Sequence, residues 1–92
     1  MPDSSSGLDL RRRRLFYRCH HTGMRETDLI LGPFARRHIA DLGEQEVDEL
    51  EALLDDVPEA DIFAWVAGLR AVPEAWRGAL MDRLMTFNIQ DA

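Results

Sequence analysis

The chain has 92 residues, of which 46% are hydrophobic, 30% charged and 8% aromatic, and its net charge is −6 at pH 7. This length allows one domain, and the composition is that of a folded protein rather than a disordered one. No apolar run approaches the ~20 residues of a membrane-spanning helix, and the single cysteine, Cys19, excludes an internal disulfide. We therefore expect a soluble domain without a membrane partner, located in the cytoplasm.

The charges are divided unequally between the two halves of the chain. Residues 1–40 contain eight arginines against four acidic residues, whereas residues 41–92 contain three arginines against thirteen acidic residues. Such a polarity can orient a protein on a partner.

The first predicted helix follows a polar stretch. Residues 1–8 have no hydrophobic periodicity, so we expect a disordered tail there and a single five-helix domain over residues 9–90. A helix is predicted over about 9–21, where Leu15 and Cys19 share one face. The opposite side carries Arg11, Arg14 and Arg18.

A second helix is predicted from about Met24 to between residues 38 and 42. Gly32 and Pro33 lie inside this span. Proline lacks a backbone donor and disfavours helical geometry in the residue before it, so we expect a kink or an interruption there.

Three further helices are predicted in the acidic half. One lies within residues 42–57, where apolar residues form a single helical stripe and acidic residues cover the rest. The stripe consists of Val47, Leu50, Leu53, Leu54 and Val57. Another follows Pro58, and the last opens at Pro73, a favourable first-turn residue. Their apolar residues are Ile62, Phe63, Trp65, Val66 and Leu69, then Trp76, Leu80, Leu84 and Phe87.

These segments together predict an all-α fold, a compact five-helix antiparallel bundle. No segment alternates with the two-residue period of a strand, and the connections are short, as such a bundle requires. The expected core contains Val47, Leu50, Leu54, Phe63, Trp65, Trp76, Leu80 and Leu84.

Cys19, His20 and His21 suggest a metal site or a reactive thiol, but their spacing argues against both. Adjacent helical residues point about 100° apart, so the three side chains cannot all face one ion. No second group of ligands follows at the spacing of a zinc site. We predict that Cys19 is a buried core residue and that the chain holds no metal.

The run from Arg11 to Arg14 raises nucleic-acid binding as an alternative. The chain as a whole is acidic and repels phosphate, whereas most nucleic-acid binders are basic. We therefore expect no nucleic-acid partner. A solvated basic face remains possible, as does a contact with carboxylates of another protein.

Residues 21–28 have a local interpretation. Gly23 can take left-handed geometry and end the first helix. It can instead be the N-cap of the second helix, with Glu26 reaching back to its free amide and Asp28 favourable near the positive end of the helix dipole.

The run YRCHHTGMRETDLILGPFA also resembles the signature of the small flavinylation factors, the SdhE type of bacteria and its mitochondrial relatives. These are five-helix proteins of similar length with an Arg-Gly-x-x-Glu motif between the first two helices. LEALLDD followed by DIFAWVAG resembles their acidic third helix and their fourth helix, so the resemblance covers about residues 10–88.

The resemblance implies an assembly factor that is not an enzyme and needs no cofactor of its own. Members of the family bind the flavoprotein subunit of succinate dehydrogenase or fumarate reductase, and they promote covalent attachment of FAD to a histidine of that subunit. We expect a monomer when the protein is free. The alternative is a small helical interaction module or an antitoxin-like module with a basic N-terminal face.

Carried onto this chain, the motif glycine is Gly23 and the motif glutamate is Glu26, whereas Thr22 replaces the arginine. Threonine has no charge and a shorter reach, so a contact made by that arginine would be lost, moved or replaced, and His21, Arg25 or Arg18 could compensate. The partner-binding residues implied by the resemblance are Gly23, Glu26, Arg25, Thr22, Asp28, Met24 and Arg18.

Overall fold

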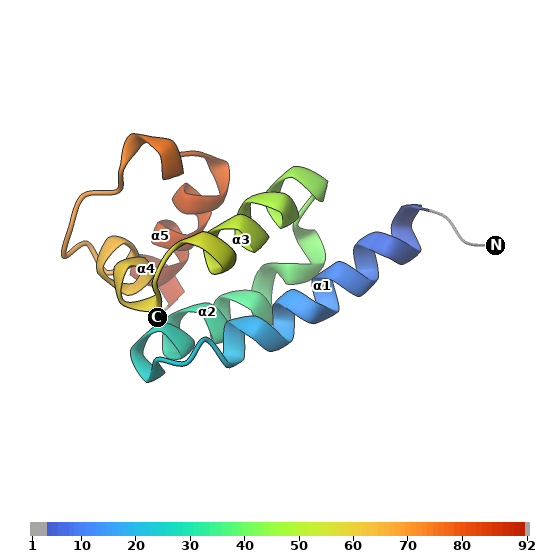
Figure 1. The fold of residues 1–92 in the computed structure, drawn as a ribbon, viewed down its shortest axis with the longest axis horizontal. Coiled ribbons are helices and arrows are strands. Elements are labelled where there is room, and N and C mark those ends of the chain that lie inside the picture. Colours follow the sequence, from blue (N-terminus) through green and yellow to red (C-terminus); the bar gives the residue numbers. More distant parts are fainter. Residues whose placement is uncertain (1–3, 92) are drawn as a thin grey trace.

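The computed structural model describes residues 4–91, and side chains over residues 7–88. The described residues form five α-helices and two 3₁₀ helices, with no strand among them (Figure 1). The elements are α1 (Ser4–His20), α2 (Arg25–His38), η1 (Ile39–Asp41), α3 (Glu44–Asp56), α4 (Glu59–Val66), η2 (Glu74–Trp76) and α5 (Ala79–Asp91). The predicted all-α fold with five helices is confirmed.

Helices α1 and α2 form a hairpin, and the other helices pack against it. Contacts join α1 to α3, α2 to α4 and α5, and α5 to both α3 and α4. Figure 1 shows α1 along one edge of the fold, with its N-terminal turns projecting past the other helices. None of the helices formed by residues 4–91 has the length and apolar character needed to cross a membrane.

Helix α1 begins earlier than the sequence predicted. The helix starts at Ser4 rather than near Asp9, so residues 4–8 are helical where a tail was expected. Leu8, one heptad before the buried Leu15, packs against the core and favours this extension. Residues 1–3 of the predicted tail lie outside the described residues.

A kink or an interruption was expected at Pro33, and the interruption is wrong, because helix α2 runs through this residue. Leu31 and Phe34, on either side of the proline, are both fully buried. Burying two such side chains contributes roughly 3–6 kcal/mol, which is enough to offset a cost of about 3 kcal/mol for a proline inside a helix. Gly32 adds a close approach to α1, because a Cβ at this position would lie 2.9 Å from the His20 ring.

The core lies between the hairpin and the three later helices. Of the predicted core residues, five are buried, namely Val47, Leu50, Trp65, Leu80 and Leu84. Leu54 and Trp76 are half-buried and pack against this core. Phe63 was predicted to be in the core, but it is half-buried and outside the cluster. The reason is that α4 buries Ile62, Trp65 and Val66, and Phe63 falls beside that face.

The end of α4 and the start of α5 differ from the helix boundaries predicted from the sequence. Helix α4 ends at Val66 and Gly68 follows with φ +80°, so Leu69 leaves the apolar face and is 69% exposed. Pro73 opens the 3₁₀ turn η2 rather than α5. Because the backbone at Arg77 is extended, with ψ 144°, the helix restarts only at Ala79.

Candidate partner-binding site

The turn between α1 and α2 comprises residues 21–24, at one end of the hairpin. Gly23 there has φ +102°, a backbone conformation that side-chain-bearing residues rarely adopt. A Cβ at Gly23 would meet no atom within 4 Å. The backbone therefore requires the glycine, and the space beside it is open to a partner.

Asp28, in the first turn of α2, holds this turn in place. Its Oδ1 accepts a hydrogen bond from the amide of Thr22 at 2.7 Å and a second bond from the Thr22 hydroxyl. The amide of Met24 donates to Thr22 Oγ1 at 3.4 Å. Hydrogen bonds to a carboxylate are roughly twice as strong as those between neutral groups. Thr22, at the arginine position of the motif, therefore serves the turn itself.

Glu26 is not a helix cap. The N-cap of α2 is Met24, and no side chain caps it, so the interpretation of Gly23 as N-cap with Glu26 bonded back to it is wrong. With Met24 as N-cap, Glu26 is the second residue of the helix, one position too early for a capping box. Its side chain is exposed and has no hydrogen bond or ion pair with any described residue. This carboxylate is available to donors on another protein.

The three side chains named as possible replacements for the motif arginine lie in different environments. Arg18 forms an ion pair with Asp55 of α3 at 2.7 Å. His21 stacks on Tyr17, with ring centroids 4.3 Å apart. Arg25 is exposed and makes no hydrogen bond or ion pair within the described part of the chain. Arg25 is therefore the candidate whose guanidinium is free to bind a partner.

The predicted site residues divide by exposure. Those exposed at the turn are Gly23, Arg25 and Glu26. Met24 is half-buried, and so are Thr22 and Asp28, which bind one another. Arg18 is directed to α3, beside a hollow of about 130 Å³ that Thr22 also lines. The motif glycine and glutamate are thus exposed together with Arg25, whereas the Arg18 guanidinium is paired with Asp55.

Thr27 contributes to the site and was not predicted. It is completely buried, and its hydroxyl donates a hydrogen bond of 2.8 Å to the carbonyl of Glu59 at the start of α4. This bond fixes the first turn of α2 against α4. The helical spacing of Thr27 with the buried Leu31 and Phe34 was a usable signal for its burial.

The environment of Cys19 confirms that it is a buried core residue. It is completely buried, and burial raises the pKa of its thiol to about 12, so the thiolate is scarce at neutral pH. His20 donates through Nδ1 to the Phe16 carbonyl at 2.7 Å and accepts from Arg36 at 3.2 Å. Within the described residues, no three potential ligands come close enough together to hold a metal ion.

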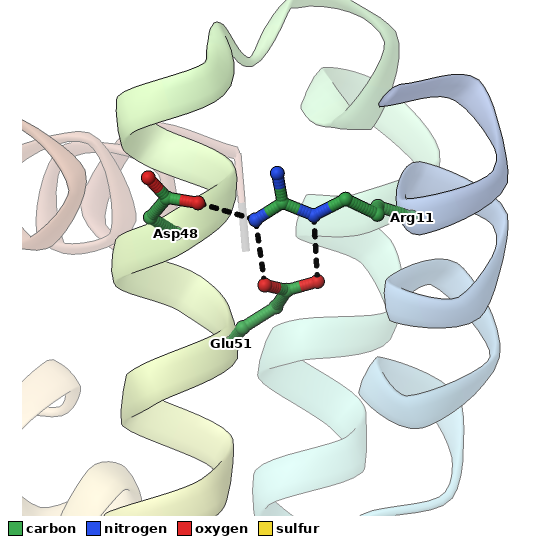
Figure 2. Close-up of polar contacts among 3 residues, drawn as sticks. All are labelled: Arg11, Asp48 and Glu51. Carbon is green, nitrogen blue, oxygen red and sulfur yellow. Dashed lines mark hydrogen bonds and ion pairs between the residues drawn. The ribbon is translucent and has the colours of Figure 1, made fainter. Parts of the chain in front are cut away.

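Part of the basic side of α1 is bound within the fold. Arg11 donates two hydrogen bonds to Glu51, at 3.1 and 2.7 Å, and a third to Asp48 (Figure 2). The Glu51 and Asp48 carboxylates raise the pKa of the Arg11 guanidinium further above its ordinary value. Arg12 donates to the Leu42 carbonyl at 2.7 Å. Carboxylates of α3 therefore neutralise two arginines of α1, Arg11 and Arg18.

Comparison with known proteins gives a family match and several relatives. The family model described as "Sdh5: Flavinator of succinate dehydrogenase" matches residues 13–88. The chain is similar to "Succinate dehydrogenase assembly factor 2, mitochondrial" of Candida glabrata, with 34% identity over 88 residues, covering 91% of this chain and 57% of that protein. The protein of the same name in Debaryomyces hansenii is 31% identical over 85 residues, which cover 89% of this chain and 59% of that protein. The protein of the same name in Danio rerio is 28% identical over 85 residues, which cover 91% of this chain and 54% of that protein. The chain spans less than two thirds of the length of these relatives.

Proposed function

The chain belongs to the Sdh5 family, the flavinators of succinate dehydrogenase, and we propose that it is an assembly factor for that enzyme. In this proposal it binds the flavoprotein subunit and promotes covalent attachment of FAD to it, without being an enzyme itself. The observation that carries the proposal is the family match over residues 13–88, which reaches from the middle of α1 into α5.

The geometry of the turn supports a contact role. Gly23 leaves open space where a partner backbone can approach closely, and Glu26 offers a carboxylate with no partner among the described residues. Arg25 adds a free cation beside it. Because Asp28 and Thr27 fasten the first turn of α2 from two sides, these contact groups are held in place before binding.

A rigid contact of this kind can act without chemistry of its own. Binding that favours one conformation of the flavoprotein raises the population in which flavin and acceptor side chain are correctly placed. The rate of bond formation then rises because the reacting groups are oriented.

The finer features of the partner are part of this proposal. We propose the flavoprotein subunit of succinate dehydrogenase as the partner, with that of fumarate reductase as the alternative, and we propose that the free factor is a monomer. The relatives are mitochondrial by name, and the cytoplasmic location expected for this chain stays a prediction, which fractionation of the native host would check.

The test is covalent flavin on the co-expressed flavoprotein subunit, read by in-gel fluorescence. We expect Glu26→Ala to lose most of the signal while its melting curve is unchanged, because the carboxylate has no described partner in the fold. Glu44→Ala is the matched control, an exposed first-turn glutamate of α3. Full flavinylation with the Glu26→Ala variant would show that this carboxylate does not belong to the partner-binding site.

A further inference from the structure

Helix α1 has three sides with different surroundings. Leu15 and Cys19 are buried on the first. On the second, Arg11 and Arg18 are bound to carboxylates of α3. The third carries large exposed side chains, of which Arg13 also lines a hollow of about 310 Å³ with Ile39 and Ala40 of η1. We call this third side the outer stripe, and it consists of Leu10, Arg13, Arg14, Tyr17 and His21.

The outer stripe combines apolar area with free positive charge. Tyr17 is 65% exposed and Leu10 is 45% exposed. Arg13 and Arg14 are exposed and make no hydrogen bond or ion pair with any described residue, in contrast to Arg11 on the same helix. Aromatic and arginine side chains supply most of the binding energy in protein interfaces.

The stripe is also continuous with the turn. From Leu10 to His21 it covers roughly 16 Å of helix at 1.5 Å per residue. His21 stacks on Tyr17 and directly precedes Thr22, so the stripe ends where the turn begins. A partner that binds Gly23 and Glu26 and lies along α1 would cover it.

We propose that the outer stripe of α1 is a second contact surface for the flavoprotein subunit and binds a carboxylate-bearing face of it around an apolar recess that takes Tyr17. This inference rests on the proposed function. The charge of the occupant follows from complementarity: two free guanidinium groups attract carboxylates and repel cations. The fold already contains a contact of this kind on α1, because Arg11 is bound to the carboxylates of Glu51 and Asp48 (Figure 2).

The charge of the chain favours a protein over a nucleic acid as occupant. Two arginines beside a tyrosine can also bind phosphates, but the chain has a net charge of −6, which opposes a polyanion at long range. A protein partner can place carboxylates only at the stripe and avoid the acidic half.

The experiment measures the affinity of the full chain for the flavoprotein subunit by biolayer interferometry, with melting followed by circular dichroism. Tyr17→Ala is compared with Leu69→Ala, which truncates a side chain that is 69% exposed between α4 and η2. Arg14→Gln is compared with Arg70→Gln, since Arg70 is an exposed arginine that pairs with Asp61. RNA binding and self-association of each protein are recorded in parallel.

We expect Tyr17→Ala to weaken flavoprotein binding at least about tenfold, with Leu69→Ala unchanged. Arg14→Gln should weaken binding about threefold at low salt and less at high salt, because an exposed ion pair is modest and screened. Arg70→Gln should bind as the wild type does, and all four variants should melt normally.

Three outcomes would overturn the inference. Wild-type affinity in Tyr17→Ala and Arg14→Gln would remove the stripe from the interface and leave the proposed function intact. Loss of RNA binding or of self-association in these variants, with the flavoprotein still bound at wild-type affinity, would assign the stripe to that other occupant. Failure of the wild type to bind the flavoprotein would refute the proposed function, and the stripe proposal with it.

Discussion

Replacing Asp28 by alanine removes the group that fastens the turn between α1 and α2. Oδ1 of Asp28 accepts from both the amide and the hydroxyl of Thr22, so one substitution breaks two charge-assisted bonds. Of the side-chain bonds that hold the backbone around Gly23, at φ +102°, only the contacts of the Thr22 hydroxyl with the Met24 backbone then remain.

The expected loss follows from these two bonds. A hydrogen bond to a charged group contributes about 1.5–3 kcal/mol when buried. Because Thr22 and Asp28 are only half-buried, we expect about 1–3 kcal/mol for the pair of bonds together. A loss of 2 kcal/mol would lower Tm by roughly 8–16 °C in a domain of this size.

The assay combines thermal melting with covalent flavin on the co-expressed flavoprotein. Asp28→Ala should reduce flavinylation even at temperatures where the variant is fully folded, because Gly23 and Glu26 are no longer held in one arrangement. Asp56→Ala is the control, an exposed aspartate at the end of α3 that pairs with no described residue. It should melt and flavinylate as the wild type does.

A double-mutant cycle tests whether Thr22 and Asp28 stabilise the turn through the same contact. Thr22→Val removes the hydroxyl donor but keeps the amide, so its effect should overlap with that of Asp28→Ala. The double variant should be more stable than the sum of single losses predicts, by about 0.5–1 kcal/mol. Strict additivity, or an unchanged melting curve for Asp28→Ala, would refute the role given to this carboxylate.

Two further predictions concern the core and the α1–α3 contact. Burial raises the pKa of the Cys19 thiol to about 12, so the thiol loses its proton at lower pH in the unfolded chain than in the folded one. The free energy of unfolding should therefore keep its full value below about pH 9 and fall as the pH rises from 9 toward 12. Urea unfolding against pH should show this fall in the wild type and not in Cys19→Ala, and parallel curves for the two would contradict it. Arg11→Gln should lower Tm more than Arg14→Gln does, because Arg11 is bound to Glu51 and Asp48 and Arg14 contacts no described partner. The difference should shrink in high salt, and equal Tm values at low salt would show that the contact adds no stability.

Helical periodicity made most of the fold predictable. The stripe of α3 places Val47, Leu50 and Leu53 at the spacing of one face, and all three are completely buried. The errors fall where tertiary packing outweighs a local preference. Pro33 lies inside α2 because its buried neighbours stabilise the helix, and Pro73 opens a 3₁₀ turn because the chain must still change direction before α5.

The site was predictable only in part. Gly23 and Glu26 follow from the motif, and the structure places both at an exposed turn. The bond from Thr22 to Asp28 was not foreseen, because a carboxylate in the first turn of a helix is equally well explained by the helix dipole. Pairing of Arg18 with Asp55 depends on the register between two helices, which no pattern within either helix specifies.

The first turn of α2 directs three consecutive side chains to three different places. Glu26 faces solvent, Thr27 is fastened to the Glu59 carbonyl of α4, and Asp28 turns back to Thr22. Each step along the helix rotates the side chain by about 100°. Deleting Asp28 would therefore move Glu26 and Thr27 one position along the helix, and it would bring the Glu26 carboxylate into the buried contact with α4 where the neutral Thr27 hydroxyl now lies. A single substitution here removes one of these contacts, whereas such a deletion changes all three at once.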